Sequence, residues 1–174
     1  QPDNPPGDTM PAMNTATPPT SAAAEVTPPS ATQPGAFLHR ALYASRRARL
    51  AAQLGPGGIA IIPTAPERQR NRDSDFLYRH DSYFYYLTGF AEPNAWLVIT
   101  ADASGACHTT LFCQPKDLER EIWDGIRLGP QAAPDALGVQ AALPVGELDK
   151  QLPRLLANRA TVWFPFAIHS GLES

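Results

Sequence analysis

Residues 66–93 read PERQRNRDSDFLYRHDSYFYYLTGFAEP, and two kinds of sequence meet in this stretch. Its first part interleaves arginines with acidic residues, so the loop can be tied together by charge-assisted hydrogen bonds. The plainer alternative is a solvated surface loop, whose ion pairs contribute little. Its second part has five aromatic residues within positions 83–90, which must bury area against the core or another domain. Gly89 suits a sharp turn before the next strand.

Strands and helices are predicted to alternate on both sides of this stretch. A segment rich in Ala, Leu and Arg, with no Gly or Pro, predicts a helix over residues 37–54. Short apolar runs predict four strands, at residues 59–62, 95–100, 106–112 and 161–166. Further helices are predicted over residues 130–138 and 147–158, and residues 63–81 are predicted to be largely loop. This order predicts an α/β domain with a mixed central sheet flanked by helices.

The first 36 residues differ from the rest of the chain. They hold 9 of the 19 prolines and no aromatic residue, and their only charges are Asp3, Asp8 and Glu25. Such a segment buries too little apolar surface to offset its ordering entropy. We therefore expect a disordered Ala/Pro/Thr-rich tail over residues 1–36 and one folded domain over residues 37–174.

Charge and hydropathy exclude two classes of partner. Acidic and basic residues balance within residues 37–174, and this argues against nucleic acid, which needs a net basic face. No apolar run approaches the roughly 20 residues of a membrane span. Cys107 and Cys113 would lie roughly 20 Å apart on one strand, too far for a disulfide. Free thiols fit a reducing cytoplasm, which is the expected location.

The chain lacks the motifs of a catalytic or metal site. The histidines are His39, His80, His108 and His169, and no two of them have the i, i+4 spacing of a helical metal site. Neither a nucleophile elbow nor a dinucleotide-binding glycine motif follows any predicted strand. We therefore predict no catalytic residue and no metal ligand in this chain.

Two ordered blocks resemble the N-terminal domain of the aminopeptidase P group, in the creatinase/methionine-aminopeptidase superfamily. The first block contributes Pro66, Glu67, Arg70, Asp73, Ser74, Tyr78, Arg79, Ser82, Phe84, Tyr86, Thr88, Gly89, Phe90, Glu92 and Pro93. The second contributes Phe112, Asp117, Glu121, Ile122, Trp123, Gly125, Arg127, Gly129, Ala133, Pro134, Leu137 and Gly138. The resemblance runs from about Phe37 to the end of the chain.

The resemblance implies a function that composition does not show. Xaa-Pro aminopeptidases of this group remove an N-terminal residue that precedes proline, and they assemble as dimers or tetramers. Their C-terminal domain binds two metal ions, typically manganese, through two Asp, one His and two Glu. No residue here matches those ligands. The resemblance therefore implies an N-terminal domain that is cut short at its C-terminal end, lacks the catalytic domain and is inactive alone.

The resemblance also assigns roles to particular residues. Asp73 and Trp123 match positions that bacterial members lend to the rim of a neighbouring subunit's active site. A carboxylate can attract the protonated N-terminus of a peptide, and an indole suits apolar substrate residues near proline. The alternatives are a salt bridge from Asp73 to Arg70 or Arg72, and interface or core packing for Trp123. The remaining signature residues are expected to be structural: Arg70, Arg79, Tyr86, Gly89, Glu92, Pro93 and Arg127.

Two other functions stay open on the sequence alone. The chain could be a non-enzymatic interaction module with the same fold, because fold does not decide chemistry. It could also belong to a prolidase, which cleaves Xaa-Pro dipeptides and shares the architecture.

Overall fold

The computed structural model describes residues 34–72 and 74–166, without the side chains of residues 34–38 and 123–124. The predicted tail falls almost entirely on residues 1–33, which lie outside the described residues. Helix α1 (Pro34–Leu54) already includes residues 34–36, where tail was expected. From residue 37 onward α1 matches the predicted helix.

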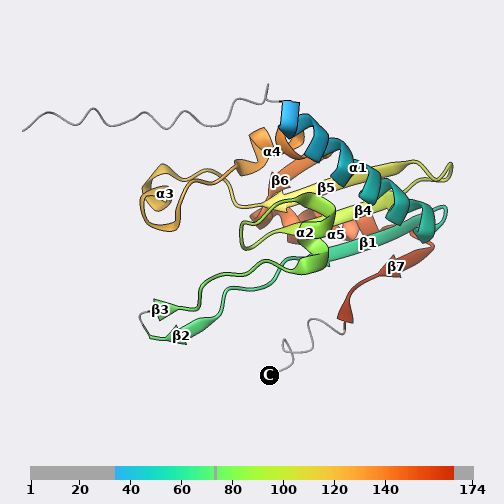
Figure 1. The fold of residues 1–174 in the computed structure, drawn as a ribbon. Helices are drawn as coiled ribbons and strands as arrows, with labels where there is room; N and C mark the ends of the chain where they lie inside the picture. Colours follow the sequence, from blue (N-terminus) through green and yellow to red (C-terminus); the bar gives the residue numbers. More distant parts are fainter. Residues whose placement is uncertain (1–33, 73, 167–174) are drawn as a thin grey trace, which may run out of the picture.

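A mixed sheet forms the centre of the molecule, as predicted, but it has five strands where the sequence predicted four. Its strand order is β6-β5-β4-β1-β7 (Figure 1). The antiparallel middle consists of β1 (Gly58–Pro63), β4 (Trp96–Ala101) and β5 (Cys107–Cys113). The two edge strands run parallel to their neighbours, β6 (Ala141–Pro144) beside β5 and β7 (Thr161–Trp163) beside β1.

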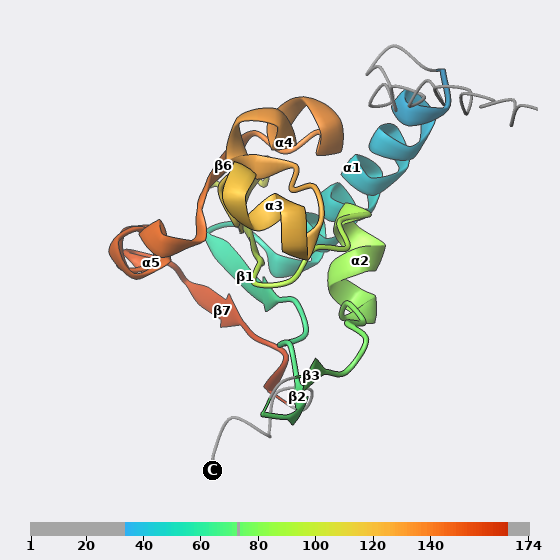
Figure 2. The ribbon, with the colours of Figure 1, turned by 90° about the vertical axis from the view of Figure 1, so that its left-hand side faces the viewer.

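Helices cover both faces of the sheet, which explains why β1 is apolar at every position. Ala60 and Ile62 face α1, α2 (Ser82–Thr88) and α4 (Gly129–Leu137), whereas Ile59 and Ile61 face α5 (Leu148–Leu156). Figure 2 shows α1 and α2 on one side of the strands and α5 on the other. The leucine face predicted for residues 147–158 belongs to α5, and it packs against the second face of the sheet.

A buried arginine joins the helices on the first face. Arg47 of α1 is only 1% exposed. Its Nη1 donates to the carbonyl of Leu87 at 2.9 Å, and its Nη2 donates to those of Leu137 and Gly138 at 3.1 and 2.6 Å. These carbonyls lie at the C-terminal ends of α2 and α4, where backbone acceptors lack helical partners and a cation is favourable. Arg47, which belongs to α1, therefore caps the C-terminal ends of both α2 and α4.

The aromatic run forms a helix that the sequence prediction missed. Asp81 caps the N-terminus of α2 by accepting the Phe84 amide at 2.8 Å, and Gly89 ends the helix in the left-handed region at φ 67°. Because a helix turns its side chains in several directions, Phe84 is buried while Tyr85 and Tyr86 are exposed. Phe90, two residues after the helix, is also buried. Burial against the core is confirmed for Phe84 and Phe90, whereas contact with another domain stays a prediction for the exposed tyrosines. The sharp backbone turn at Gly89 is confirmed.

Other local predictions need correction. The expected loop over residues 63–81 contains a hairpin of β2 (Gln69–Asn71) and β3 (Ser74–Asp75). Helix α3 (Leu118–Asp124) and strand β6 were not predicted, and a 3₁₀ turn (Val145–Glu147) precedes α5. The last strand stops at Trp163 rather than 166. Both cysteines are free thiols on β5, as expected. Within residues 34–166, as far as they are described, no helix is long and apolar enough to cross a membrane.

Candidate functional site

The two blocks of sequence that carry the family resemblance, residues 66–93 and 112–138, meet at one end of the sheet; we call them the signature blocks. Pro63, Trp96 and Phe112 lie in register there across β1, β4 and β5. The hairpin β2–β3 and helix α3 both project from this end (Figure 1). Between them lies a largely polar cavity of about 350 Å³, lined by Glu67, Asp75, Glu92, Pro93, Asn94, Gln114, Arg120, Gly125, Ile126 and Arg127. Three signature residues, Glu92, Pro93 and Arg127, are thus brought together.

The hairpin forms one wall of the cavity. The Phe76 amide donates to the Arg68 carbonyl at 2.9 Å, and Ser74 Oγ donates to Asn71 Oδ1 at 2.9 Å, which closes the turn. Position 73 lies between the two strands, and its structure is outside the described residues. The predicted role of Asp73 therefore stays a prediction; Glu67 and Asp75 are the residues of this segment that line the cavity.

Helix α3 and the residues after it form the opposite wall. Asp117 caps the helix by accepting the amides of Glu119 and Arg120, each at 3.2 Å. The helix ends at Gly125, whose φ of 90° favours glycine. Trp123 belongs to this helix, but its side chain is not among those described, so its predicted role also stays a prediction.

Aliphatic side chains stand exposed along the α3 wall. Leu118 and Ile122 are four residues apart on one face of α3, and each is 78% exposed. Ile126, just after the helix, is 82% exposed. Exposed apolar clusters of this kind are typical of surfaces that meet another protein surface.

Glu92 lines the cavity and is bonded to the segment that follows α3. Its Oε1 accepts the Leu128 amide at 2.8 Å. Among the described residues, Glu92 Oε2 and Glu121 Oε1 are buried and accept no hydrogen bond. Burial raises the pKa of Glu92, and the nearby Glu121 raises it further, whereas the Leu128 amide and Arg127 act in the opposite direction. The cavity therefore holds a partly buried carboxylate at an energetic cost.

Amide groups complete the connections around the cavity. Asn94, at φ 54°, donates through Nδ2 to Glu67 Oε2 at 3.0 Å. Gln114 Nε2 donates to the Pro93 carbonyl at 3.4 Å. These bonds link the start of the charged loop, the Glu92-Pro93 turn and the end of β5. No sequence signal pointed to Asn94, Gln114 or Arg120, because their approach depends on how three distant segments fold together.

The other signature residues are not among those that line the cavity. Arg70 and Arg79 are exposed on the hairpin and on the loop that follows it. Tyr86 lies on α2, where its ring centroid is 4.1 Å from the guanidinium carbon of Arg46. Gly89 lies against the Tyr43 ring, so close that a Cβ added at Gly89 would be 2.6 Å from Tyr43 Cζ. Tyr86 and Gly89 therefore contribute to the packing of α2 against α1, and the expected structural roles of Arg70 and Arg79 stay predictions.

The described titratable side chains indicate what chemistry this region can support. No three described His, Cys, Asp or Glu side chains gather in a group that could hold a metal ion. Burial raises the pKa of the Cys113 thiol to about 12, so the thiol is protonated and a poor nucleophile. With acidic, basic and amide groups on its walls, the cavity is suited to hydrogen bonding with polar groups.

Fold and cavity define the class of this protein: an α/β domain with a five-stranded mixed sheet that presents a polar cavity at one end. The chain belongs to the family of the aminopeptidase P N-terminal domain, whose model matches residues 43–163, more than half of the chain. The resemblance of the two sequence blocks is thereby confirmed.

Its relatives are Xaa-Pro aminopeptidases. The chain is 44% identical over 126 residues to the Xaa-Pro aminopeptidase of Escherichia coli. This match covers 72% of this chain and 29% of that protein. The enzyme of the same name from Haemophilus influenzae is 36% identical over 137 residues, covering 78% of this chain and 31% of that protein. This chain therefore spans less than a third of the length of these relatives.

Solved structures agree with the sequence relatives. Aminopeptidase P from Escherichia coli with the inhibitor Pro-Leu matches at a TM-score of 0.69 and 43% identity, over 72% of this chain and 28% of that chain. A zinc-substituted form of the Escherichia coli enzyme in complex with product matches at a TM-score of 0.68 and 44% identity, over 71% of this chain and 28% of that chain.

Proposed function

We propose that this chain is the N-terminal domain of a manganese-dependent Xaa-Pro aminopeptidase, and that it shapes the substrate cleft and the oligomer interface of that enzyme. The observation that carries the proposal is the polar cavity in which the two signature blocks meet. Position 73 comes between the two strands of the hairpin in the sequence, and position 123 belongs to α3. The proposal is that both residues reach substrate at this end of the sheet.

Charge and shape at this end support a cleft-forming role. Asp75, Glu67 and Glu92 place carboxylates on the cavity, and Asp73 would add another at its edge. Arg120 and Arg127 offset part of this negative charge, so the proposal assigns the attraction of a peptide's protonated N-terminus to Asp73 itself. The exposed aliphatic residues of α3 would pack against a neighbouring subunit, which would bring Trp123 close to that subunit's bound peptide.

The metal ions of the enzyme would be held outside this chain. The described residues do not form a metal-binding group, and no reaction step is assigned to them. Two manganese ions in the catalytic domain would supply the activated water and the stabilisation of the oxyanion. The domain's contribution is to position the peptide and to restrict entry to short or unstructured N-termini. Alone, the domain would not cleave an Xaa-Pro peptide.

The test is a pair of substitutions made in the full-length aminopeptidase of which this chain is proposed to be one domain. Asp73→Asn removes the charge with little change in size, and Trp123→Ala removes the indole. Each is expected to lower kcat/KM for an Xaa-Pro tripeptide at least about tenfold, a loss of roughly 1.4 kcal/mol in transition-state binding. Activity on tripeptides rather than dipeptides would also separate an aminopeptidase from a prolidase.

Asp102→Asn is the matched control for the charge change. Asp102 lies in the turn between β4 and β5, at the opposite end of the sheet from the cavity. Its Oδ1 accepts the amides of Ser104 and Ala106, each at 2.8 Å, and an asparagine oxygen can do the same. This variant should retain full activity. Wild-type activity in both Asp73→Asn and Trp123→Ala would contradict the proposed role.

A further inference from the structure

The segment that carries α3 leaves the body of the domain and returns to it at one place. We call residues 115–127, which lie between β5 and α4, the α3 arm; it projects beyond the end of the sheet (Figure 1). Gly129, where the arm has returned, has a φ of 74°, and a Cβ added to it would be 3.0 Å from Lys116 Cγ. The outgoing and the returning chain therefore lie against each other, at residues 114–116 and 128–129, and we call this place the neck of the arm.

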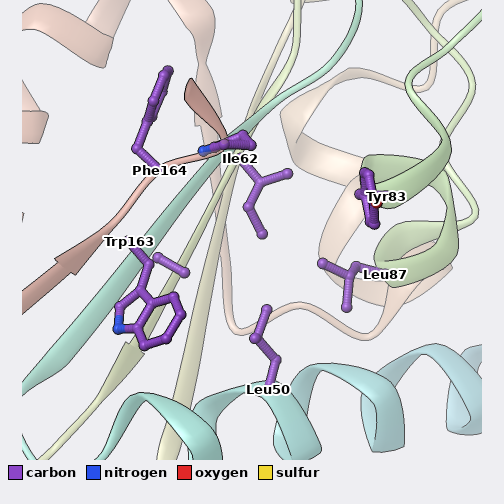
Figure 3. Close-up of a pocket in the computed structure, with 8 residues that line it drawn as sticks. Leu50, Ile62, Tyr83, Leu87, Trp163 and Phe164 are labelled. Atoms are coloured by element: carbon purple, nitrogen blue, oxygen red, sulfur yellow. The ribbon is translucent and has the colours of Figure 1, made fainter. Parts of the chain in front are cut away.

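Apolar packing fixes α2 on the body, whereas the described aliphatic side chains of α3 are exposed. Figure 3 shows Leu87 of α2 pointing into the same apolar cavity, of about 440 Å³, as Leu50 of α1 and Ile62 of β1. On α3, by contrast, Leu118 and Ile122 are both largely exposed. Burial of apolar surface is what usually fixes an amphipathic helix on a domain. The described side chains of α3 provide little such packing, so the polar contacts of the arm matter more.

Two polar contacts with the Glu92-Pro93 turn close the neck. On the outgoing side, Gln114 Nε2 donates to the Pro93 carbonyl at 3.4 Å. On the returning side, the Leu128 amide donates to Glu92 Oε1 at a shorter 2.8 Å. Leu128 is the N-cap of α4 and has no side-chain oxygen, so Glu92 supplies an acceptor there from a distant segment, as the glutamate of a capping box does from within a helix. The Glu92 contact is thus the shorter of the two attachments.

We propose that Glu92 is a positioning residue: by holding the Leu128 amide, it sets the direction in which the α3 arm presents position 123 and its aliphatic side chains. The reach of the side chain decides this role more than its charge, because burial and the nearby Glu121 both raise the pKa of Glu92 and so disfavour its charged form. The Leu128 side chain packs against the core, so loss of the bond should change the direction of the arm without detaching α4. Only the step from the arm to catalysis rests on the proposed function, in which position 123 reaches a neighbouring subunit's peptide.

Distances between spin labels test the position of the arm. In the full 174-residue chain with Cys107→Ser, nitroxides are attached at Ala48→Cys on α1 and Glu119→Cys on α3, both exposed positions, and the buried Cys113 is left in place. Glu92→Asp keeps the charge but shortens the reach by about 1.5 Å, which is enough to break a hydrogen bond of ordinary length. The distance distribution should therefore broaden in Glu92→Asp. It should keep its wild-type width in Glu92→Gln, which keeps the reach and loses the charge.

Glu67→Asp is the matched control for the shortened side chain. Glu67 lines the same cavity, but its Oε2 accepts from Asn94 and not from the arm, so the distribution should not broaden. A second label pair, Ala48→Cys with Asp149→Cys on α5, reports on the body and should keep its width in every variant. A wild-type distribution in Glu92→Asp would overturn the proposal. So would equal broadening in Glu92→Gln or Glu67→Asp, or broadening of the body pair.

Kinetics in the full-length aminopeptidase separate this inference from the proposed function. There Glu92→Asp should raise KM for an Xaa-Pro tripeptide at least about threefold, with kcat less affected, and Glu92→Gln should restore KM. A loss of kcat at unchanged KM would indicate only a role in stability and overturn the proposal, as would a raised KM without broadening of the arm. A broadened arm with unchanged KM and kcat would instead contradict the role proposed for position 123, and Glu92 would still position the arm.

Discussion

At the scale of single residues, Gly89 shows how one position combines two constraints. Its φ of 67° is in the left-handed region, and its missing side chain leaves room for the ring of Tyr43. The sequence predicted the first constraint, because a glycine after an aromatic run indicates a turn. It could not predict the second, because Tyr43 comes from α1, 46 residues earlier in the chain.

Gly89→Ala and Gly105→Ala separate these two constraints. Gly105 has a φ of 83° and open space around its Cα, so alanine there meets only the backbone strain of about 1–2 kcal/mol. Gly89→Ala should lose at least about 1 kcal/mol more, because its Cβ would also overlap the Tyr43 ring. Urea denaturation of both variants measures the difference. Equal losses would show that Tyr43 moves aside without cost.

Glu92 gives a pH-dependent prediction at the same scale. Its pKa in the folded state is raised above the reference value of 4.5, mainly by burial. Below about pH 4.5 the carboxyl is protonated in both the folded and the unfolded protein. As pH rises through the folded-state pKa, the ionised form becomes costly only in the folded protein, so stability is lost. Glu92→Gln keeps an acceptor for the Leu128 amide and removes the titration.

The free energy of unfolding of Glu92→Gln should therefore increase relative to wild type as pH rises from about 4.5 to neutrality. Denaturant titrations of the two proteins across this range provide the measurement. A difference that stays constant with pH, or that narrows as pH rises, would contradict the account of the buried carboxylate. The sequence marked Glu92 as a signature residue, but its burial against Leu128 and Glu121 could not be predicted from it.

At the scale of elements, Arg47 holds three helices in one arrangement. Its guanidinium reaches carbonyls at the ends of α2 and α4 from the middle of α1. Arg47→Met would fill similar volume but leave three buried carbonyls without their donor. Each unsatisfied buried acceptor costs about 1–3 kcal/mol, so we expect a total loss of roughly 3–5 kcal/mol.

Arg49→Met is the matched control for this prediction. Arg49 lies on the same helix but is exposed, and its Nη2 donates to the Tyr86 hydroxyl at a longer 3.2 Å. Its replacement should change stability by no more than about 0.5 kcal/mol. Thermal or urea unfolding of both variants measures the contrast. Similar losses in the two variants would mean that the carbonyls around Arg47 find other partners.

The elements differ in how well the sequence predicted them, and for a physical reason. The central strands are apolar at consecutive positions because helices cover both faces of the sheet, and such runs are conspicuous in a sequence. Helix α2 was missed because its exposed tyrosines hide its buried positions, Phe84 and Leu87. Strand β6 is short and only half buried, and α3 carries its aliphatic residues on the outside. Neither has the pattern of a core element.

Only part of the candidate site could be predicted from the sequence. Its position in the sequence was predicted by the two signature blocks, which identify Glu92, Pro93 and Arg127. The cavity itself arises from the approach of the hairpin, the Glu92-Pro93 turn and α3, which are separated by tens of residues. No local pattern predicts that approach, so Asn94, Gln114 and Arg120 were found only in the structure.

At the scale of the whole molecule, the domain carries a cavity and an exposed apolar ridge at the same end. Leu118, Ile122 and Ile126 form the ridge, beside the wall that contains Trp123. This arrangement makes sense if the end of the sheet meets another subunit, since the ridge would then be covered and the cavity would open toward that subunit's peptide. The proposed function depends on this contact between subunits.

The most direct test mixes two inactive or weakened forms of the longer enzyme. One form has Trp123→Ala in this domain and an intact catalytic domain; the other has an intact N-terminal domain and a disabled metal site. If the domain completes a neighbour's cleft, subunits reassembled together should cleave an Xaa-Pro tripeptide faster than the sum of the two forms measured separately. Activity equal to that sum would contradict the account, because each cleft would then depend only on its own chain.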